Sequence, residues 1–504
     1  MNVFIRSIRL RMLPLFMLGL SIAVLPVFPQ PKQITILHTN DMHATFLPAE
    51  AFWIRTSPKP LVGGFNELAF AVDSIRNVKA ATLLLDAGDL MTGNPITDRV
   101  YRGAEGGALV EMLNLIGYEG WTPGNHDFDI SYDNFRNLAA VARFPVVTAN
   151  LVDEKSGKPV AGKEYLLLEK GGLKIGVFGL MSSEFYNLVS QNSTVGVKLL
   201  PPEETARRMV ELLRPKTDLL IALSHQGVWG DSALAVKVKG IDVIVGGHSH
   251  TRLTQPKFVN GVVIVQAGSN AQNLGILDLT IENKSVTHFD GKLLQLWSQP
   301  HRSTAVTALI DSFRTEIDRE YSEVIGTLLS PWDMDGWETG VGNFMADAQR
   351  EAANADVAFM NNHGIRKKLG PGPMTKQNLF EVIPFRNTLT TFELSGKQIR
   401  EIVLYDLKEN PRIQVSGIQC EWKRGATGGV EIVTLRINGK PIDEHGTYKG
   451  AASDYFMGES KRYLGIETPR LAFLNATLFD IVEKRVRTLK NVDAKIEGRI
   501  KEVH

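Results

Sequence analysis

Residue types that bind divalent metal ions recur in the first half of the chain, each time just after a short apolar run. The runs have the composition of buried strands, and α/β proteins bind ligands beyond the carboxyl ends of their strands. Carboxylate, amide and imidazole groups together form a ligand set for Zn, Mn, Fe or Co. Five motifs supply them: Asp41-Met42-His43, Gly88-Asp89, Gly124-Asn125-His126-Asp127, His225 and Gly247-His248-Ser249-His250.

These motifs contain seven potential ligands: two carboxylates, one amide and four imidazoles. Seven ligands are too many for one tetrahedral ion. They suit two ions that share a bridging carboxylate. Each motif alone is weak, because a lone histidine such as His225 is usually a core or surface residue, and Asn125-His126 is compatible with an ordinary turn. Their joint occurrence at strand ends favours a dinuclear metal centre, and the flanking glycines allow the chain to turn close to each ligand.

The elements that must position these motifs are short apolar strands separated by helix-like stretches, which indicates an α/β layered core. An amphipathic helix is expected at about 303–322, followed from about 326 by an α+β pattern. The strands are expected at 34–37, 82–85, 146–147, 174–180, 219–223, 242–245 and 262–265.

The composition narrows the class of protein. A length of 504 residues predicts two domains, and a net charge of +1 argues against a dedicated nucleic-acid-binding protein. The single cysteine, Cys420, excludes an intramolecular disulfide. It lies among β-type residues, so we interpret it as a buried strand position rather than a nucleophile.

The N-terminus has the pattern of a secretory signal. Three arginines precede an apolar run over residues 12–28, and Pro14, Gly19 and Pro26 interrupt that run. A membrane anchor is the alternative, but the continuous apolar part is short for a span. We therefore expect a signal peptide at 1–29, a periplasmic or secreted mature protein, and no stable membrane association after cleavage.

The sequence resembles the calcineurin-like metallophosphoesterases, and within them the 5'-nucleotidase and UDP-sugar hydrolase family. Leu37 to His43, Gly124 to Asp129, and Gly247 to His250 carry the resemblance. It implies an α/β fold with a four-layer αββα metallophosphoesterase domain and a smaller α+β 5'-nucleotidase C-terminal domain joined by a connecting helix. The expected boundaries are 33–297 for the catalytic domain, 298–325 for the linker helix and 326–504 for the substrate-binding domain.

The resemblance also implies roles for the metal-binding residues. Asp41, His43 and His250 would hold one divalent ion, Zn, Mn, Co or Fe. The second ion would be held by Asn125, His225 and His248, with Asp89 bridging the two. The position of His250 varies among relatives.

His126 and Asp129 resemble the catalytic dyad of the family. A charged His126 would stabilise the transition state and assist the leaving oxygen, while Asp129 would orient its imidazole. The alternative for Asp129 is a simple cap on the following helix. A metal-bridging hydroxide would attack the phosphorus atom.

The second domain would bind the substrate. Arg366 ends a motif similar to the phosphate-binding loop of the family, and Arg386-Asn387 resembles its next loop, with Arg386 where glycine is common. A surface role for Arg386 is equally compatible. Relatives hold the base between two aromatic rings; Tyr455 occupies one such position, whereas the segment 412–417 lacks an aromatic residue. Core packing is the alternative role for Tyr455.

The expected function is hydrolysis of nucleoside 5'-monophosphates, with UDP-sugars as further candidates. One alternative keeps the metal centre but changes the substrate to 2',3'-cyclic nucleotides or other phospho- or sulfur-esters. A second alternative is a non-catalytic secreted binding protein with a vestigial site. The presence of all seven expected ligands and both dyad residues argues against that second alternative.

Overall fold

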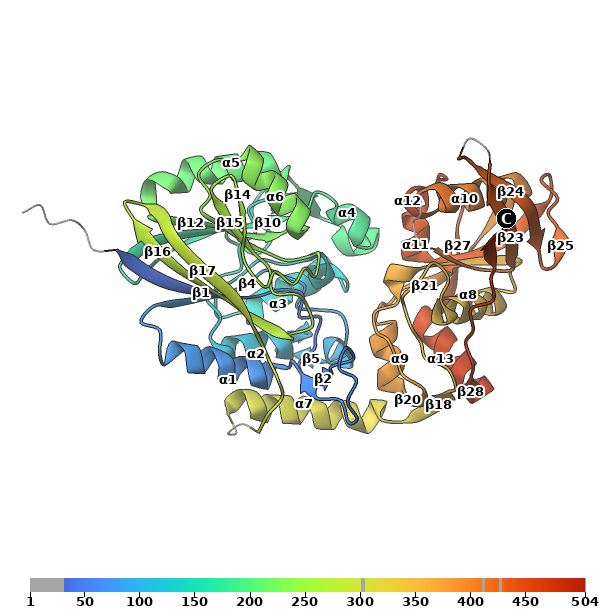
Figure 1. Ribbon diagram of the computed structural model, residues 1–504, viewed down its shortest axis with the longest axis horizontal. Coiled ribbons are helices and arrows are strands. Elements are labelled where there is room, and N and C mark those ends of the chain that lie inside the picture. Colours follow the sequence, from blue (N-terminus) through green and yellow to red (C-terminus); the bar gives the residue numbers. More distant parts are fainter. Residues whose placement is uncertain (1–30, 301–303, 410–412, 426–427, 504) are drawn as a thin grey trace, which may run out of the picture.

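The computed structural model describes residues 31–300, 304–409, 413–425 and 428–503, so the signal peptide expected at 1–29 lies outside them. Two bodies lie side by side in Figure 1, one built from the blue-to-green part of the chain and one from the orange-to-red part. Among the described residues, no helix has the length and apolarity needed to cross a membrane.

The first body is a sandwich of two mixed sheets, each with parallel strands next to antiparallel ones. One sheet has the order β17 (Ser285–Gln295), β16 (Asn273–Glu282), β1 (Lys32–Thr39), β4 (Thr82–Asp86), β7 (Gly120–Trp121). The other has the order β14 (Lys257–Val259), β15 (Val262–Val265), β13 (Val243–Gly246), β12 (Leu219–His225), β10 (Leu173–Met181), β9 (Tyr165–Lys170).

Helices cover both outer faces of the sandwich. The first sheet is covered by α1 (Phe65–Arg76), α2 (Gly107–Ile116), α3 (Tyr132–Val141) and α7 (Ala305–Tyr321), and the second by α5 (Pro202–Leu213) and α6 (Gly227–Lys237). Alternate strand residues such as Ile36, Val177 and Ile221 fill the space between the sheets. Burial on both faces accounts for the continuous apolar runs, and the four-layer αββα prediction is confirmed.

The expected connecting helix is α7. Thr304 caps it by accepting a hydrogen bond from the Thr307 amide (3.2 Å), and its stripe of Val306, Ile310 and Phe313 is buried. This stripe joins the core beneath the first sheet, so the helix packs as part of the first domain and then leads into the second (Figure 1). The exact domain boundaries stay a prediction.

The second body is α+β, as expected. Its main sheet has the order β22 (Ile413–Ser416), β19 (Val357–Asn361), β26 (Thr447–Ser453), β21 (Thr388–Ser395), β27 (Ala472–Thr477). Smaller sheets are formed by β20 (Gly372–Thr375), β18 (Val324–Leu328) and β28 (Asn491–Val492), and by β25 (Lys440–Pro441), β24 (Val430–Ile437), β23 (Ile418–Arg424) and β29 (Ile500–Glu502). The helices are α8 (Gly340–Ala353), α9 (Lys376–Val382), α10 (Gly396–Glu409), α11 (Asp454–Gly458), α12 (Ser460–Leu464) and α13 (Leu478–Leu489).

Cys420 lies on β23 with its side chain buried, and burial raises the pKa of its thiol to about 12. A thiol with so high a pKa stays protonated at neutral pH and is a poor nucleophile. The strand interpretation of this residue therefore agrees with its place in the fold.

A buried carboxyl group in α10 makes the stability of the second domain pH-dependent. Burial raises the pKa of Asp406 from 3.8 to about 7, so the folded state holds a proton that the unfolded chain releases above about pH 4. The free energy of unfolding should therefore fall as pH rises from about 4 to about 7. We expect Asp406→Asn to remove this part of the dependence and to stabilise the protein at pH 8 by on the order of a few kcal/mol.

Chemical unfolding of wild type and variant at pH 5 and pH 8 measures this difference. Asp133→Asn, which makes the same change at an exposed position of α3, is the matched control. An Asp406→Asn protein with the same pH dependence as wild type would contradict the expectation.

Candidate metal centre and interdomain cleft

The five metal-binding motifs all leave the same edge of the sandwich. Asp41 follows β1, Asp89 follows β4, and Asn125 begins a short 3₁₀ helix after β7. On the facing sheet, His225 is the last residue of β12, and the segment that carries His248 and His250 follows β13. Because parallel strands end together, ligands far apart in the sequence converge between the two sheets.

Five of these residues adopt a left-handed backbone conformation, which residues other than glycine rarely take. Their φ angles are 50° at Asp41, 46° at His43, 58° at Asp89, 78° at His248 and 53° at His250. Each such residue costs about 1–3 kcal/mol and persists only where the surroundings hold it. The Asp41 amide donates to the Gly88 carbonyl (2.8 Å) and the His43 amide to the Asp89 carbonyl (3.0 Å), which fixes two of these turns.

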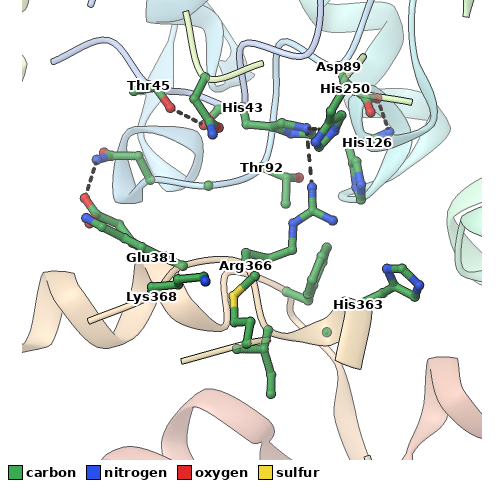
Figure 2. Close-up of a pocket in the computed structure, with 18 of the residues that line it drawn as sticks. His43, Thr45, Asp89, Thr92, His126, His250, His363, Arg366, Lys368 and Glu381 are labelled. Carbon is green, nitrogen blue, oxygen red and sulfur yellow. Dashed lines mark hydrogen bonds and ion pairs between the residues drawn. The ribbon is translucent and has the colours of Figure 1, made fainter. Parts of the chain in front are cut away.

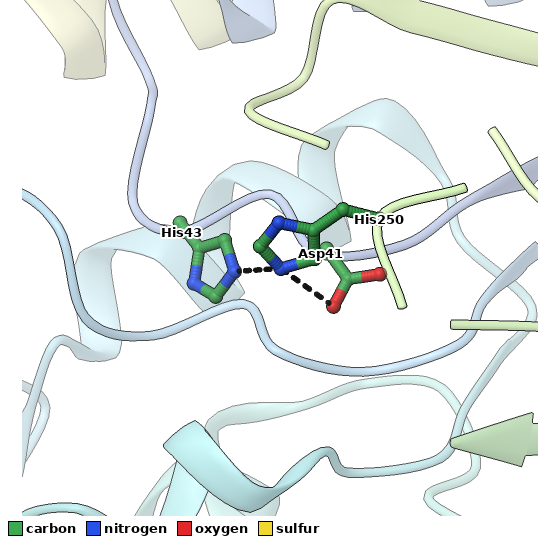
Figure 3. Close-up of side chains that lie close together, drawn as sticks. All are labelled: Asp41, His43 and His250. Carbon is green, nitrogen blue, oxygen red and sulfur yellow. Dashed lines mark hydrogen bonds and ion pairs between the residues drawn. The ribbon is translucent and has the colours of Figure 1, made fainter. Parts of the chain in front are cut away.

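Two groups of potential ligand atoms result. Asp41, His43 and His250 form the first group (Figure 3), and Asp89, His225 and His248 form the second; in each group these atoms lie within 4.8 Å of one another. In the first, the Nε2 atoms of His43 and His250 are 3.0 Å apart. In the second, His225 Nε2 lies 3.2 Å from an Asp89 carboxylate oxygen.

Burial keeps three of the imidazoles neutral, with a lone pair available for a metal ion. It lowers the pKa of His250 to about 3, that of His248 to about 4, and that of His43 well below its usual value. Burial alone would also lower the pKa of His225, but the neighbouring Asp89 carboxylate raises it to about 10. The buried carboxylates thus attract positive charge to this position.

Two buried atoms test whether metal ions fit this site. Asn125 Oδ1 is buried and has no hydrogen-bond partner among the described residues, and the buried His225 Nε2 has the Asp89 carboxylate at 3.2 Å as its close partner there. A buried polar atom without a partner is costly, and a bound cation would satisfy Asn125 Oδ1 and would lie between the carboxylate and imidazole groups. The donor set of carboxylate, amide and imidazole therefore fits divalent ions, although the role of each residue as a ligand stays a prediction.

His126 and Asp129 form a close pair beside the two groups. His126 Nδ1 donates to Asp129 Oδ2 (2.7 Å), which also accepts from the Thr92 hydroxyl (2.6 Å). Burial would lower the pKa of His126, but the charge of Asp129 raises it above its usual value. The cap of α3 is Ser131, so Asp129 is not the helix cap and its carboxylate orients the imidazole.

The two bodies enclose a cleft of about 1510 Å³, which is lined by residues of both metal-binding groups and by the dyad. Arg366 enters it from the second domain, and its guanidinium points toward His43 and His250 (Figure 2). One guanidinium nitrogen lies 3.3 Å from His43 Nε2, and the guanidinium packs over the Phe385 ring (5.8 Å). A planar donor group at this place suits an anionic substrate held against the metal-binding residues.

The other predicted substrate residues also line the cleft, with different surroundings. Arg386 pairs with Asp98 (2.8 Å) and Glu105 (3.0 Å) of the first domain, which offset its charge. Asn387 lies beside it. The Tyr455 hydroxyl donates to the Asn187 carbonyl across the domain boundary (3.2 Å). The structure therefore gives Arg386 and Tyr455 contacts between the domains.

Two neighbours of the dyad did not emerge from the sequence. Thr92 holds Asp129, and Phe385 packs against both His126 (5.6 Å) and Arg366. Thr92 has a φ of 68°, an unusual value for a β-branched residue, but no residue pattern reveals such a value. Both residues act through contacts between loops that are distant in the sequence.

Comparisons with known proteins agree with this geometry. Residues 34–252 match the calcineurin-like phosphoesterase family, and residues 324–464 match the 5'-nucleotidase C-terminal domain. The fold and the site thus define a calcineurin-like phosphoesterase, a metal-dependent hydrolase of phosphoric esters. The two matches together place the chain in the 5'-nucleotidase family.

Several relatives match over most of this chain. The trifunctional nucleotide phosphoesterase YfkN of Bacillus subtilis is 29% identical over 93% of this chain, which spans only 35% of that protein. The 5'-nucleotidase of Diplobatis ommata is 28% identical over 93% of this chain and 90% of its own length. The crystal structure of a 5'-nucleotidase precursor from Thermus thermophilus has a TM-score of 0.82, with 26% identity, 94% coverage of this chain and 99% of that chain.

The ion pairs of Arg386 should favour the arrangement in which the cleft is closed. Exposed ion pairs stabilise by about 0.2–1 kcal/mol each, so loss of both pairs in Arg386→Gln should shift the balance toward more open forms by roughly two- to thirtyfold. We expect a larger mean radius of gyration in small-angle scattering of the variant. Arg136→Gln, which removes a single ion pair within α3, is the control. Identical scattering of wild type and Arg386→Gln would show that these pairs do not hold the domains together.

Proposed function

We propose that this protein hydrolyses nucleoside 5'-monophosphates, using two divalent metal ions, after export to the periplasm or the extracellular space. The observation that carries the proposal is the meeting of three features in one cleft. These are the paired groups of metal-binding residues, the His126–Asp129 pair, and an arginine that reaches them from the second domain. Export is supported by the signal-like pattern at the N-terminus.

We assign the first ion to Asp41, His43 and His250, and the second to Asn125, His225 and His248, with Asp89 between them. The two groups of converging atoms support this division, as does the buried Asn125 Oδ1, which has no hydrogen-bond partner among the described residues. Two divalent ions, when bound, would lower the pKa of water and offset the charge of the phosphoryl oxygens. The identity of the metal is left open among Zn, Mn, Co and Fe.

The remaining residues bind and orient the substrate. Arg366 would hold non-bridging phosphoryl oxygens with its two-pronged donor group. His126 lines the cleft, and because its Nδ1 is held by Asp129, its Nε2 is the ring nitrogen left to face the substrate. A proton at that nitrogen would pass to the ester oxygen as its bond to phosphorus breaks, while a water oxygen forms the new bond. The products are inorganic phosphate and a nucleoside.

Recognition of the base is less strongly supported than hydrolysis of the ester. Segment 413–416 forms the buried strand β22 and offers no aromatic ring, and the Tyr455 hydroxyl bonds to the first domain. A single ring would bind the base more weakly than two, by about 1–3 kcal/mol. UDP-sugars, 2',3'-cyclic nucleotides and other phospho- or sulfur-esters therefore remain in the substrate panel.

We expect metal-stripped protein to release phosphate from AMP only after Mn²⁺, Zn²⁺ or Co²⁺ is added back. The panel would also contain UDP-glucose, 2',3'-cyclic AMP and p-nitrophenyl phosphate, with Asp89→Ala as the inactive control. Activity on the cyclic or small aromatic ester alone would keep the metal centre and exclude the nucleotidase assignment. A wild-type protein that releases nothing with any metal would contradict the proposed function.

Loss of the dyad histidine should lower kcat while leaving the metal centre intact. His126→Gln keeps a polar side chain but cannot transfer a proton, so kcat for AMP should fall about 10²–10⁴-fold. Metal content, measured by mass spectrometry, should match that of wild type. Asn94→Ala, which also removes a polar side chain that lines the cleft, is the control for general perturbation. A fall in kcat that parallels lost metal would show that His126 serves the metal site instead.

A further inference from the structure

The carboxylate of Asp127 makes four hydrogen bonds, all to backbone amides. Its Oδ2 accepts from the Asp89 amide (3.0 Å) and the Gly124 amide (2.8 Å), and its Oδ1 accepts from the Leu90 (3.0 Å) and Met91 (3.1 Å) amides. The side chain is buried. Two carboxylate oxygens offer about four acceptor positions, so Asp127 has none left for a metal ion or a substrate.

These bonds join two loops that each carry a predicted metal ligand. Asp89, Leu90 and Met91 follow β4, whereas Gly124 and Asn125 follow β7. The connection is reciprocal, because the His126 amide, from the Asp127 loop, donates to Asp89 Oδ1 (2.8 Å). Each aspartate thus accepts amide hydrogens from the other's loop.

The loop after β4 and the loop after β7 lie in direct contact. A Cβ atom at Gly88 would lie 2.3 Å from the backbone nitrogen of Gly124, so the two backbones meet directly. Asp89 has a φ of 58°, and the turn directs three successive amides toward one carboxylate. A left-handed residue persists only where its surroundings hold it, and Asp127 supplies that constraint.

We propose that Asp127 is a positioning residue that sets the relative placement of Asp89 and Asn125, and thereby the affinity of the centre for its metal ions. The inference rests on the proposed function, since it assumes that these two residues are ligands. Asp127 itself contacts neither metal nor substrate.

Two substitutions separate acceptor capacity from side-chain size. Asp127→Asn preserves the size but leaves one acceptor oxygen and turns an NH₂ group toward backbone amides. Asp127→Glu preserves both carboxylate oxygens but adds a methylene group. If the acceptors matter, the asparagine variant should lose Mn²⁺ affinity about 10–100-fold, and the glutamate variant should lose less. Calorimetric titration of the metal-stripped proteins with Mn²⁺ measures this, with Asp133→Asn as the matched surface control.

A second measurement reports on the loops without metal. In metal-free protein, hydrogen exchange of the peptides that contain residues 88–91 and 123–125 should be faster in Asp127→Asn than in wild type or Asp133→Asn. Unchanged exchange together with Mn²⁺ affinity within twofold of wild type would overturn the proposal. A glutamate variant that binds Mn²⁺ more weakly than the asparagine variant would also overturn it, because size would then be decisive.

If Asp127→Asn does not fold, the glutamate variant decides the matter. Mn²⁺ affinity within tenfold of wild type supports the proposal, whereas a loss as large as that of Asp89→Ala contradicts it. These outcomes are distinct from failure of the proposed function, in which wild-type protein itself would bind no Mn²⁺ or would release no phosphate.

Discussion

Two buried carboxylates that repel each other, Asp41 and Asp89, impose the main constraint on this structure. Burial and mutual repulsion both raise the pKa of Asp41, to about 7, and the nearby His225 opposes that rise. Buried charges of one sign require cations within a few ångströms. The centre meets this requirement in two ways, through residues suited to divalent ions and through Arg366, whose guanidinium arrives from the second domain.

This requirement explains why the two domains contribute different kinds of side chain to the cleft. The first domain concentrates acceptors and neutral imidazoles at the ends of its strands, where the core ends and loops are free to converge. The second domain contributes the cation and the ring of Phe385 against which it packs. Residues of both domains line the same cleft, so under the proposed function catalysis would depend on the closed arrangement of both.

The sequence was sufficient to predict the fold class, the helix before the second domain and the convergence of the metal-binding motifs. Those features follow from local patterns: apolar runs, chemically distinctive residues after them, and the stripe of Val306, Ile310 and Phe313. The sequence did not reveal that Thr92 holds Asp129, that Arg386 pairs with Asp98 and Glu105, or that Asp127 joins two loops. Each of these depends on contacts between segments that only the folded sheets bring together, and residue type alone does not encode them.

The packing of α7 has a consequence for how the two domains behave as a pair. Because the helix belongs to the core of the first domain as far as Tyr321, and β18 of the second begins at Val324, only Ser322 and Glu323 separate the two bodies along the chain. Such a short connection spans at most about 7 Å and allows rotation but little separation. Arg366 therefore stays at a high effective concentration near the metal-binding residues even when the cleft opens. The covalent connection between the domains thus lowers the entropic cost of bringing the Arg366 guanidinium to the substrate, because it restricts the position of Arg366 before any substrate binds.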